Sequence, residues 1–185
     1  MIAPLYARIM GDTWIRIAEP VRLAHATHSV TRAHGRLRVE HGRGFAARLL
    51  VQLLGLPRQS AAADTHLVVT ARPGGEHWQR TIDGRRIDTW QYQSNATELG
   101  ERFGVFDLRF RLDEAAGSLL YVHRESAVVF GSRRLRVPAL CAPRVEARED
   151  PSGPARVKVS VRISLPLVGL LIAYDGPIEI EDSRP

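Results

Sequence analysis

One arginine of this sequence stands in a pattern that turns it toward the inside of the fold. Residues 77–82 and 85–93 flank Asp83-Gly84, a dipeptide typical of a two-residue hairpin turn. Because directly paired residues share a face, Arg80 and Gln91 lie on the more apolar face of this hairpin. A guanidinium in an apolar interior must be paired or bind something, so Arg80 is a candidate ligand contact. The alternative is an edge hairpin in which Arg80 reaches water. The residues that share this face are Trp78, Arg80, Ile82, Ile87, Thr89 and Gln91.

Two further side chains could move protons beside Arg80. Glu101 stands near the end of the polar stretch Ser94–Arg102, at the expected entrance of the next strand, where functional residues are common. His123 follows Tyr121 by two residues, so the two share one face of a strand, as a general base in a cavity would. Arg80, Glu101 and His123 are therefore the candidate catalytic residues. A surface position for His123 is the alternative.

Motifs for a cofactor or a metal do not accompany these residues. No serine stands in a Gly-x-Ser-x-Gly elbow, no Gly-x-Gly-x-x-Gly follows a strand, and no phosphate loop occurs. His25 and His28 have a spacing that would suit two metal ligands, but no cysteine or carboxylate at motif spacing completes a set. We expect no cofactor and no metal.

Alternating strands form the scaffold that must position these side chains. In Val157–Leu165 the odd positions are apolar and the even ones polar, and Phe106–Asp113 alternates in the same way. About nine to eleven such strands, with a helical segment over 4–26 and a short helix over 45–54, predict an α+β, mainly β fold. The expected architecture is a curved antiparallel sheet or a barrel. No linker divides the chain, so we expect a single domain over 1–185.

The interior of such a sheet is a ligand cavity wherever side chains do not fill it. An apolar pocket with a few convergent polar groups is the usual form of such a site. Its expected wall and polar end consist of Trp78, Arg80, Gln91, Phe106, Phe110 and Tyr121.

The segment Gly44–Leu56 admits three interpretations. It is apolar, has Arg43, Arg48 and Arg58 around it, and could be a lid over the cavity or a cap on one end of a barrel. A helix of this composition could also lie on a membrane surface. The sequence does not separate these three.

Composition excludes several other classes of protein. The chain has 185 residues, a net charge of +6 and 26 basic residues, of which only Lys158 is a lysine. Its arginines are spread along many strands among acidic residues, so we expect no nucleic-acid partner. Cys141 is the only cysteine and reads as a small buried hydrophobe. The longest apolar run, Leu165–Ala173, is too short to span a bilayer, and we expect no secretion signal. We therefore expect a cytoplasmic protein without a transmembrane segment.

Several segments resemble the bacterial family called domain of unknown function 4166. The resemblance covers nearly the whole chain and includes the motif around 75–80, the segment 142–149 and the segment 163–171. It implies no established activity and no established catalytic residues. It places Trp78, Arg80 and Gln91 inside a family motif. Family members occur alone or fused to dehydrogenase-like domains, so a second copy of the chain or a dehydrogenase-like domain is an expected partner.

Three functions are compatible with these observations. The first is a barrel or half-barrel that binds a hydrophobic or amphipathic small molecule. The second is a cofactor-free cyclase or isomerase that acts on an apolar substrate in the same cavity. The third is an accessory domain that binds another protein through an exposed sheet edge. An inward carboxylate or histidine near Arg80 would favour the enzyme, and a sheet edge without a cavity would favour the third.

Overall fold

The chain folds into a closed antiparallel β-barrel. The structure, a computed structural model, describes residues 3–27 and 29–184. Ten strands form the barrel, which the pairing of β6 with β7 closes, and β8 adds an eleventh strand beside β7. This confirms the expected mainly β fold. The strands are β1 (Val30–His41), β2 (Ser60–Arg72), β3 (Gly75–Ile82), β4 (Arg85–Asn95), β5 (Glu98–Phe103), β6 (Phe106–Ala115), β7 (Ser118–Phe130), β8 (Arg133–Arg136), β9 (Arg144–Gly153), β10 (Arg156–Leu165) and β11 (Gly169–Arg184).

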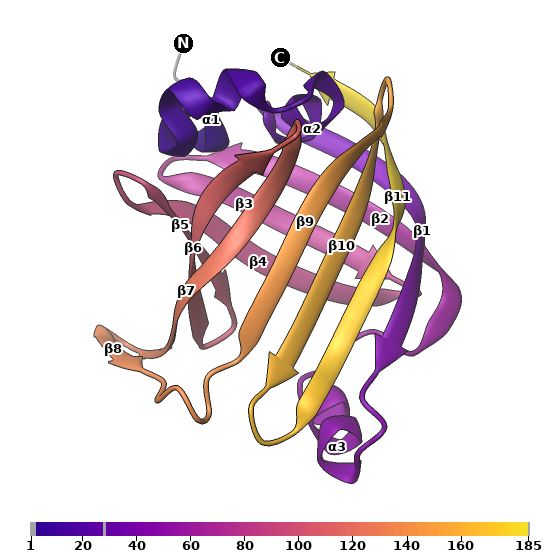
Figure 1. The fold of residues 1–185 in the computed structure, drawn as a ribbon, viewed down its shortest axis with the longest axis vertical. Helices are drawn as coiled ribbons and strands as arrows, with labels where there is room; N and C mark the ends of the chain where they lie inside the picture. Colours follow the sequence, from indigo (N-terminus) through magenta and orange to yellow (C-terminus); the bar gives the residue numbers. More distant parts are fainter. Residues whose placement is uncertain (1–2, 28, 185) are drawn as a thin grey trace.

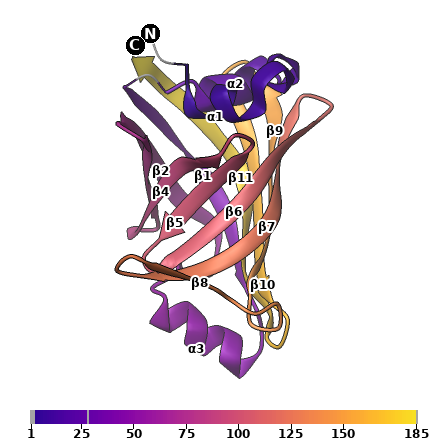
Figure 2. The same cartoon turned by 90° about the vertical axis from the view of Figure 1, so that its left-hand side faces the viewer.

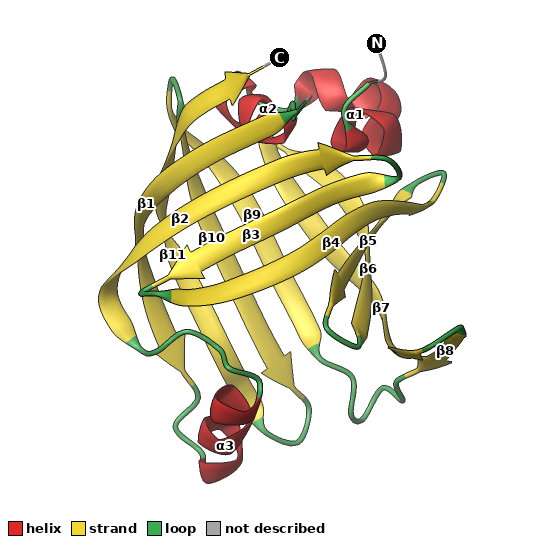
Figure 3. Ribbon diagram, turned by 180° about the vertical axis from the view of Figure 1, so that it is seen from behind, coloured by secondary structure: helices red, strands yellow, loops and turns green. Residues whose placement is uncertain are grey.

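Strand alternation sorts side chains between the inside and the outside of the barrel, as the sequence predicts. In β10 the inward residues include Val159, Val161 and Ile163, which line the interior. In β6 the inward residues include Phe106 and Phe110. Figure 3 shows how the strands wrap around a common interior, with β1 to β4 toward the viewer.

One end of the barrel is covered by the N-terminal segment, which forms α1 (Leu5–Met10), the 3-10 helix η1 (Gly11–Arg16) and α2 (Glu19–His25). Figures 1 and 2 both show these pieces lying across the barrel end. Tyr6 of α1 and Val21 of α2 are fully buried. The segment is also tied to the β6–β7 turn, where the Ala18 amide donates to the Gly117 carbonyl at 2.9 Å. The helices therefore act as a packed cover for this end.

The opposite end carries α3 (Phe45–Leu53), which Figure 1 shows beside the turn between β10 and β11. Its packed face is small: Ala47 and Val51 are buried. Ala47 lies close to Gly42, where a side chain would collide with the Leu170 carbonyl. The larger residues Phe45 and Leu53 point away and are 75% and 72% exposed.

Within the described part of the chain, no helix combines the length and the apolar character that crossing a membrane requires. The expectation that Cys141 is buried is wrong, because its side chain is exposed in the loop between β8 and β9.

Candidate functional site

A pocket of about 480 Å³ lies inside the barrel. Its lining is mostly apolar and comes from nearly every strand, with additional residues from α2, from the α3 segment and from the loop before β9. All of the ligand-binding residues expected from the sequence belong to this lining, and so does Glu101. The expected residues found there are Trp78, Arg80, Gln91, Glu101, Phe106, Phe110 and Tyr121.

The hairpin formed by β3 and β4 turns Arg80 into this pocket. Arg80 pairs with Ile87, and Trp78 pairs with Thr89, which confirms the register expected from Asp83-Gly84. The Arg80 side chain is 20% exposed, and the pocket is what it faces. The interpretation of Arg80 as an edge residue that reaches outward to water is therefore wrong.

Three neighbours hold the Arg80 guanidinium in place. Its NH1 donates to the Thr89 hydroxyl at 2.8 Å and to Glu101 Oε1 at 3.3 Å. Its Cζ lies 4.9 Å from the centre of the Trp78 ring, a distance suited to a cation–π contact. Burial alone would lower the pKa of Arg80, but the Glu101 carboxylate raises it above its ordinary value. Arg80 is thus a fixed cation whose charge is balanced by one carboxylate.

Glu101 reaches Arg80 because it lies within a strand rather than at a strand entrance. In β5, Glu101 pairs with Gln91 of β4, which in turn pairs with Glu76 of β3. Gly100 makes this close pairing possible, since a side chain there would overlap the ring of Tyr92. Three polar side chains therefore form one row across three neighbouring strands.

A second polar network joins the helical cover to the barrel. The Tyr6 hydroxyl donates to Gln91 Oε1 at 2.7 Å and lies 3.1 Å from the Tyr121 hydroxyl. Tyr121 donates to Glu149 Oε1 at 2.9 Å, and His25 Nε2 lies 2.7 Å from Glu149 Oε2. These groups form one connected chain from α1 and α2 to β4, β7 and β9.

The charges in this network are fixed by burial and by neighbours. Burial alone would raise the pKa of Glu149, but His25 lowers it below its ordinary value. The pKa of Tyr121 is raised well above its ordinary value. Burial is the largest cause, and the negative charge of Glu149 is the second. Tyr121 therefore remains a protonated donor beside an ionised carboxylate, which suits anchoring and ligand orientation.

Sequence reasoning missed Tyr6, His25 and Glu149 as parts of the site. The signal for Glu149 was present, because Val145, Ala147 and Glu149 alternate onto one face of β9. The sequence around His25 indicates only a candidate metal ligand together with His28, which lies outside the described residues. Among the residues that the structure describes, no group of three or more histidine, cysteine or acidic side chains could hold a metal ion.

His123 is placed apart from the other candidate catalytic residues. Its Nε2 lies 3.0 Å from the Ser126 hydroxyl and 3.1 Å from the Glu125 carbonyl. Its ring packs against Phe110 at 5.5 Å, but His123 is not part of the pocket lining. Burial lowers the pKa of His123. The structure therefore brings Arg80 and Glu101 together and places His123 outside the pocket, against Phe110 and Ser126.

Glu76 is a buried carboxyl group with only part of its hydrogen-bonding capacity used. Its Oε2 accepts from the Trp78 indole at 3.0 Å, while its Oε1 is buried without a partner among the described residues. Burial raises the pKa of Glu76. An ionised Glu76 therefore costs stability, and this cost grows as the pH rises.

We predict that Glu76→Gln increases the free energy of unfolding at pH 7 by about 1 kcal/mol, because it removes a poorly compensated buried charge. Because the pKa of Glu76 is raised in the folded protein, the contribution of Glu76 to stability is most favourable below its ordinary value of 4.5 and is lost as the pH rises through the folded value. The gain should therefore shrink in urea titrations as the pH is lowered toward 4. Glu146→Gln, at an exposed position of β9, is the control. A gain that does not depend on pH would contradict this account of Glu76.

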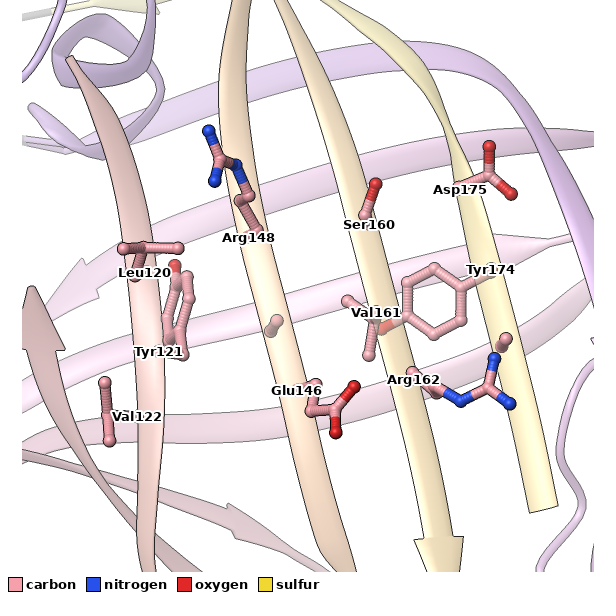
Figure 4. A pocket seen from close by; sticks show the side chains of 12 residues that line it. Leu120, Tyr121, Val122, Glu146, Arg148, Ser160, Val161, Arg162, Tyr174 and Asp175 are labelled. Carbon is pink, nitrogen blue, oxygen red and sulfur yellow. The ribbon is translucent and has the colours of Figure 1, made fainter. Parts of the chain in front are cut away.

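A second depression, of about 520 Å³, lies on the wall formed by β7, β9, β10 and β11. Figure 4 shows Tyr121 on β7 and Tyr174 on β11, with Arg148 on β9 and Arg162 on β10 between them. Tyr121 and Tyr174 also line the interior pocket. The depression is therefore the outer side of the wall behind the polar groups of the interior.

These features define a class of protein: a closed antiparallel barrel with an interior pocket and a buried polar cluster. The chain belongs to the family described as domain of unknown function (DUF4166), whose model matches residues 17–178. A search of curated proteins gives no match. Among solved structures, a secretary abundant heat soluble (SAHS) protein from Ramazzottius varieornatus is similar, with a TM-score of 0.40 and 13% identity over 80% of this chain and 91% of that chain.

Proposed function

We propose that this protein binds one hydrophobic or amphipathic small molecule inside its barrel. The observation that carries the proposal is the interior pocket, whose volume of about 480 Å³ falls within the range of small-molecule sites. Aromatic and aliphatic side chains would hold the apolar part of the ligand. The polar groups Arg80, Gln91 and Glu101 would hold its polar end.

The polar end of the ligand is expected to be neutral. Arg80 donates to Thr89 and Glu101 through NH1 alone, and its Nε and NH2 groups donate to no described residue. These donors suit a carbonyl or hydroxyl oxygen. A ligand carboxylate would also meet the Glu101 carboxylate beside Arg80 and the ionised Glu149 in the same lining, and like charges at short range disfavour each other.

We predict that 1-decanol binds at least about tenfold more tightly than decanoate, which corresponds to one unfavourable charge contact of about 1.4 kcal/mol. Isothermal titration calorimetry at pH 7.5 measures both dissociation constants. Decane serves as the control for the apolar chain alone. Saturable binding of decanol to one site supports the proposal, whereas no saturable binding of any of the three compounds would contradict it.

Binding without turnover is the function that the geometry supports best. A cofactor-free cyclase or isomerase that uses Arg80, Glu101 and His123 remains a hypothesis, and conversion of a bound apolar substrate would support it. The accessory-domain hypothesis is weakened because the closed barrel pairs its strands on both sides and leaves β8 as the exposed edge. We further propose that residues 1–185 form a single domain. A cytoplasmic location stays a prediction.

A further inference from the structure

Exposed apolar side chains gather at one end of the barrel. Of the nine large hydrophobic residues that are exposed in the described part of the chain, only Ile15 lies on the helical cover. Because the barrel strands alternate in direction, the α3 segment, the β5–β6 and β10–β11 turns and the β7–β9 connection all lie at the opposite end. Those segments carry the other eight, which are Phe45, Leu49, Leu53, Val105, Phe130, Leu135, Leu140 and Leu167. We call this set and its arginines the rim.

The rim is also positively charged. Residues 41–59, 129–144 and 165–169 contain seven arginines and no aspartate or glutamate. Arg134 and Arg136 are paired with Glu125. The other five are exposed and form no ion pair with a described residue, and they are Arg43, Arg48, Arg58, Arg133 and Arg144.

The interior pocket reaches the rim. Leu54 and Pro57 from the α3 segment and Val137 and Pro143 from the β8–β9 connection are part of its lining. Cys141 both lines the pocket and is exposed. Figures 1 and 2 place α3 and β8 at this end and the N-terminal helices at the other. The rim therefore surrounds the end at which the pocket meets solvent.

We propose that the rim docks on the surface of an anionic lipid bilayer. Exposed apolar side chains interspersed with arginine are the combination that binds such a surface, through partial insertion together with attraction to acidic headgroups. Docking would place the mouth of the pocket against the apolar phase from which a poorly soluble ligand would come. This last step rests on the proposed function, whereas docking itself does not.

Charge favours a bilayer over a second copy of the chain. Two rims facing each other would bring together two sets of unpaired arginines, which repel. The rim residues also come from four separate segments around the mouth rather than from one continuous face. Anionic phosphates between apolar chains match that mixed pattern.

The test measures co-sedimentation with vesicles of phosphatidylcholine containing 30% phosphatidylglycerol, and with vesicles of phosphatidylcholine alone. Binding to the anionic vesicles that falls with added salt is the expected result. The double variant Arg43→Gln and Arg48→Gln should weaken binding to the anionic vesicles about fivefold for each arginine lost, because each arginine near such a surface contributes about 1 kcal/mol of attraction. Phe45→Ser with Leu53→Ser should weaken it at least about tenfold, because both side chains would leave the apolar phase. Each of these four residues is exposed, so the fold should be retained, as thermal unfolding would verify.

The matched controls lie at the covered end of the barrel. Ile15→Ser removes an equally exposed hydrophobic residue, and Arg32→Gln with Arg72→Gln removes two exposed arginines. These variants should bind vesicles like the wild type. Rim variants that behave like the controls would overturn the proposal. So would a dimer in sedimentation velocity that the Phe45 and Leu53 changes dissolve, because the rim would then be a contact between two copies.

Decanol titration of the same variants separates this proposal from the ligand-binding proposal. The rim variants should lose vesicle binding and keep the wild-type affinity for decanol. A chain that binds vesicles but no decanol would refute only the proposed function, and a chain that binds decanol but no vesicles would refute only the docking.

Discussion

Replacing Glu149 by alanine is expected to lower the free energy of unfolding by about 3 to 5 kcal/mol, because it removes the carboxylate to which two buried groups hydrogen-bond, at about 1.5 to 3 kcal/mol for each hydrogen bond to a charged group. His25 is fully buried, and Glu149 is its carboxylate partner at 2.7 Å. The change also removes the acceptor of the Tyr121 hydroxyl. Because Tyr121 contacts Tyr6, the loss would spread to the helical cover. Urea denaturation at pH 7 measures it.

Two comparisons make this prediction specific. Glu179→Ala breaks an exposed pair with Arg156 and should leave the free energy of unfolding unchanged within error. His25→Leu with Glu149→Leu removes both members of this buried pair and should cost less than Glu149→Ala alone. A loss below about 1 kcal/mol for Glu149→Ala would mean that the pair does not anchor the cover.

The pH dependence of the same variant has a defined sign. The pKa of Glu149 is lowered in the folded protein, so its contribution to stability is present above the ordinary value of 4.5 and is lost as the pH falls through the folded value. Wild type and Glu149→Ala should therefore become more similar in stability as the solution is acidified below pH 4.5.

Replacing Arg80 by leucine is expected to weaken decanol binding by about 10- to 100-fold, the effect of losing one hydrogen bond from a charged donor. The change removes the donors at Nε and NH2 that face the pocket while keeping an apolar side chain beside Trp78. Calorimetric titration measures the affinity, and urea denaturation of the same variant shows whether the fold is intact. Unchanged affinity in a folded variant would remove Arg80 from the binding site.

Glu101→Gln tests whether the negative charge of Glu101 makes the pocket prefer a neutral ligand over an anionic one. The amide can still accept from Arg80 NH1, but it no longer repels a ligand carboxylate. Decanoate should therefore bind about tenfold more tightly to this variant than to wild type, whereas decanol affinity should change little. Equal gains for both ligands would show that pocket shape, and not charge, sets the preference.

Much of the barrel wall could be predicted from the sequence because strands alternate with a period of two. The β3–β4 hairpin is the clearest case, since one turn dipeptide fixes the register and hence the inward position of Arg80. The sequence does not predict β5, because its short polar sequence conceals the alternation of apolar and polar residues. The pairing of β5 with β4 and β6 is what turns Glu101 toward the interior.

The polar network could not be predicted because its partners are far apart in the chain. Tyr6 and Gln91 are separated by 85 residues, and Tyr6 and Tyr121 by 115. Periodicity assigns a residue to a face but does not say which face of which strand lies opposite. The orientation of α3 escaped prediction for a related reason: the helix is apolar on more than one side, and the close approach at Gly42 selects Ala47 for the packed side. Cys141, in an apolar sequence, is exposed because its loop lies at the rim.

A crystal structure of the protein with 1-decanol tests the central claim most directly. The account predicts one alcohol inside the barrel, with its hydroxyl within hydrogen-bond distance of the Arg80 guanidinium and its chain running toward Phe106 and the α3 end. A pocket closed by repacked side chains, or an alcohol held only on the outside of the barrel, would contradict it.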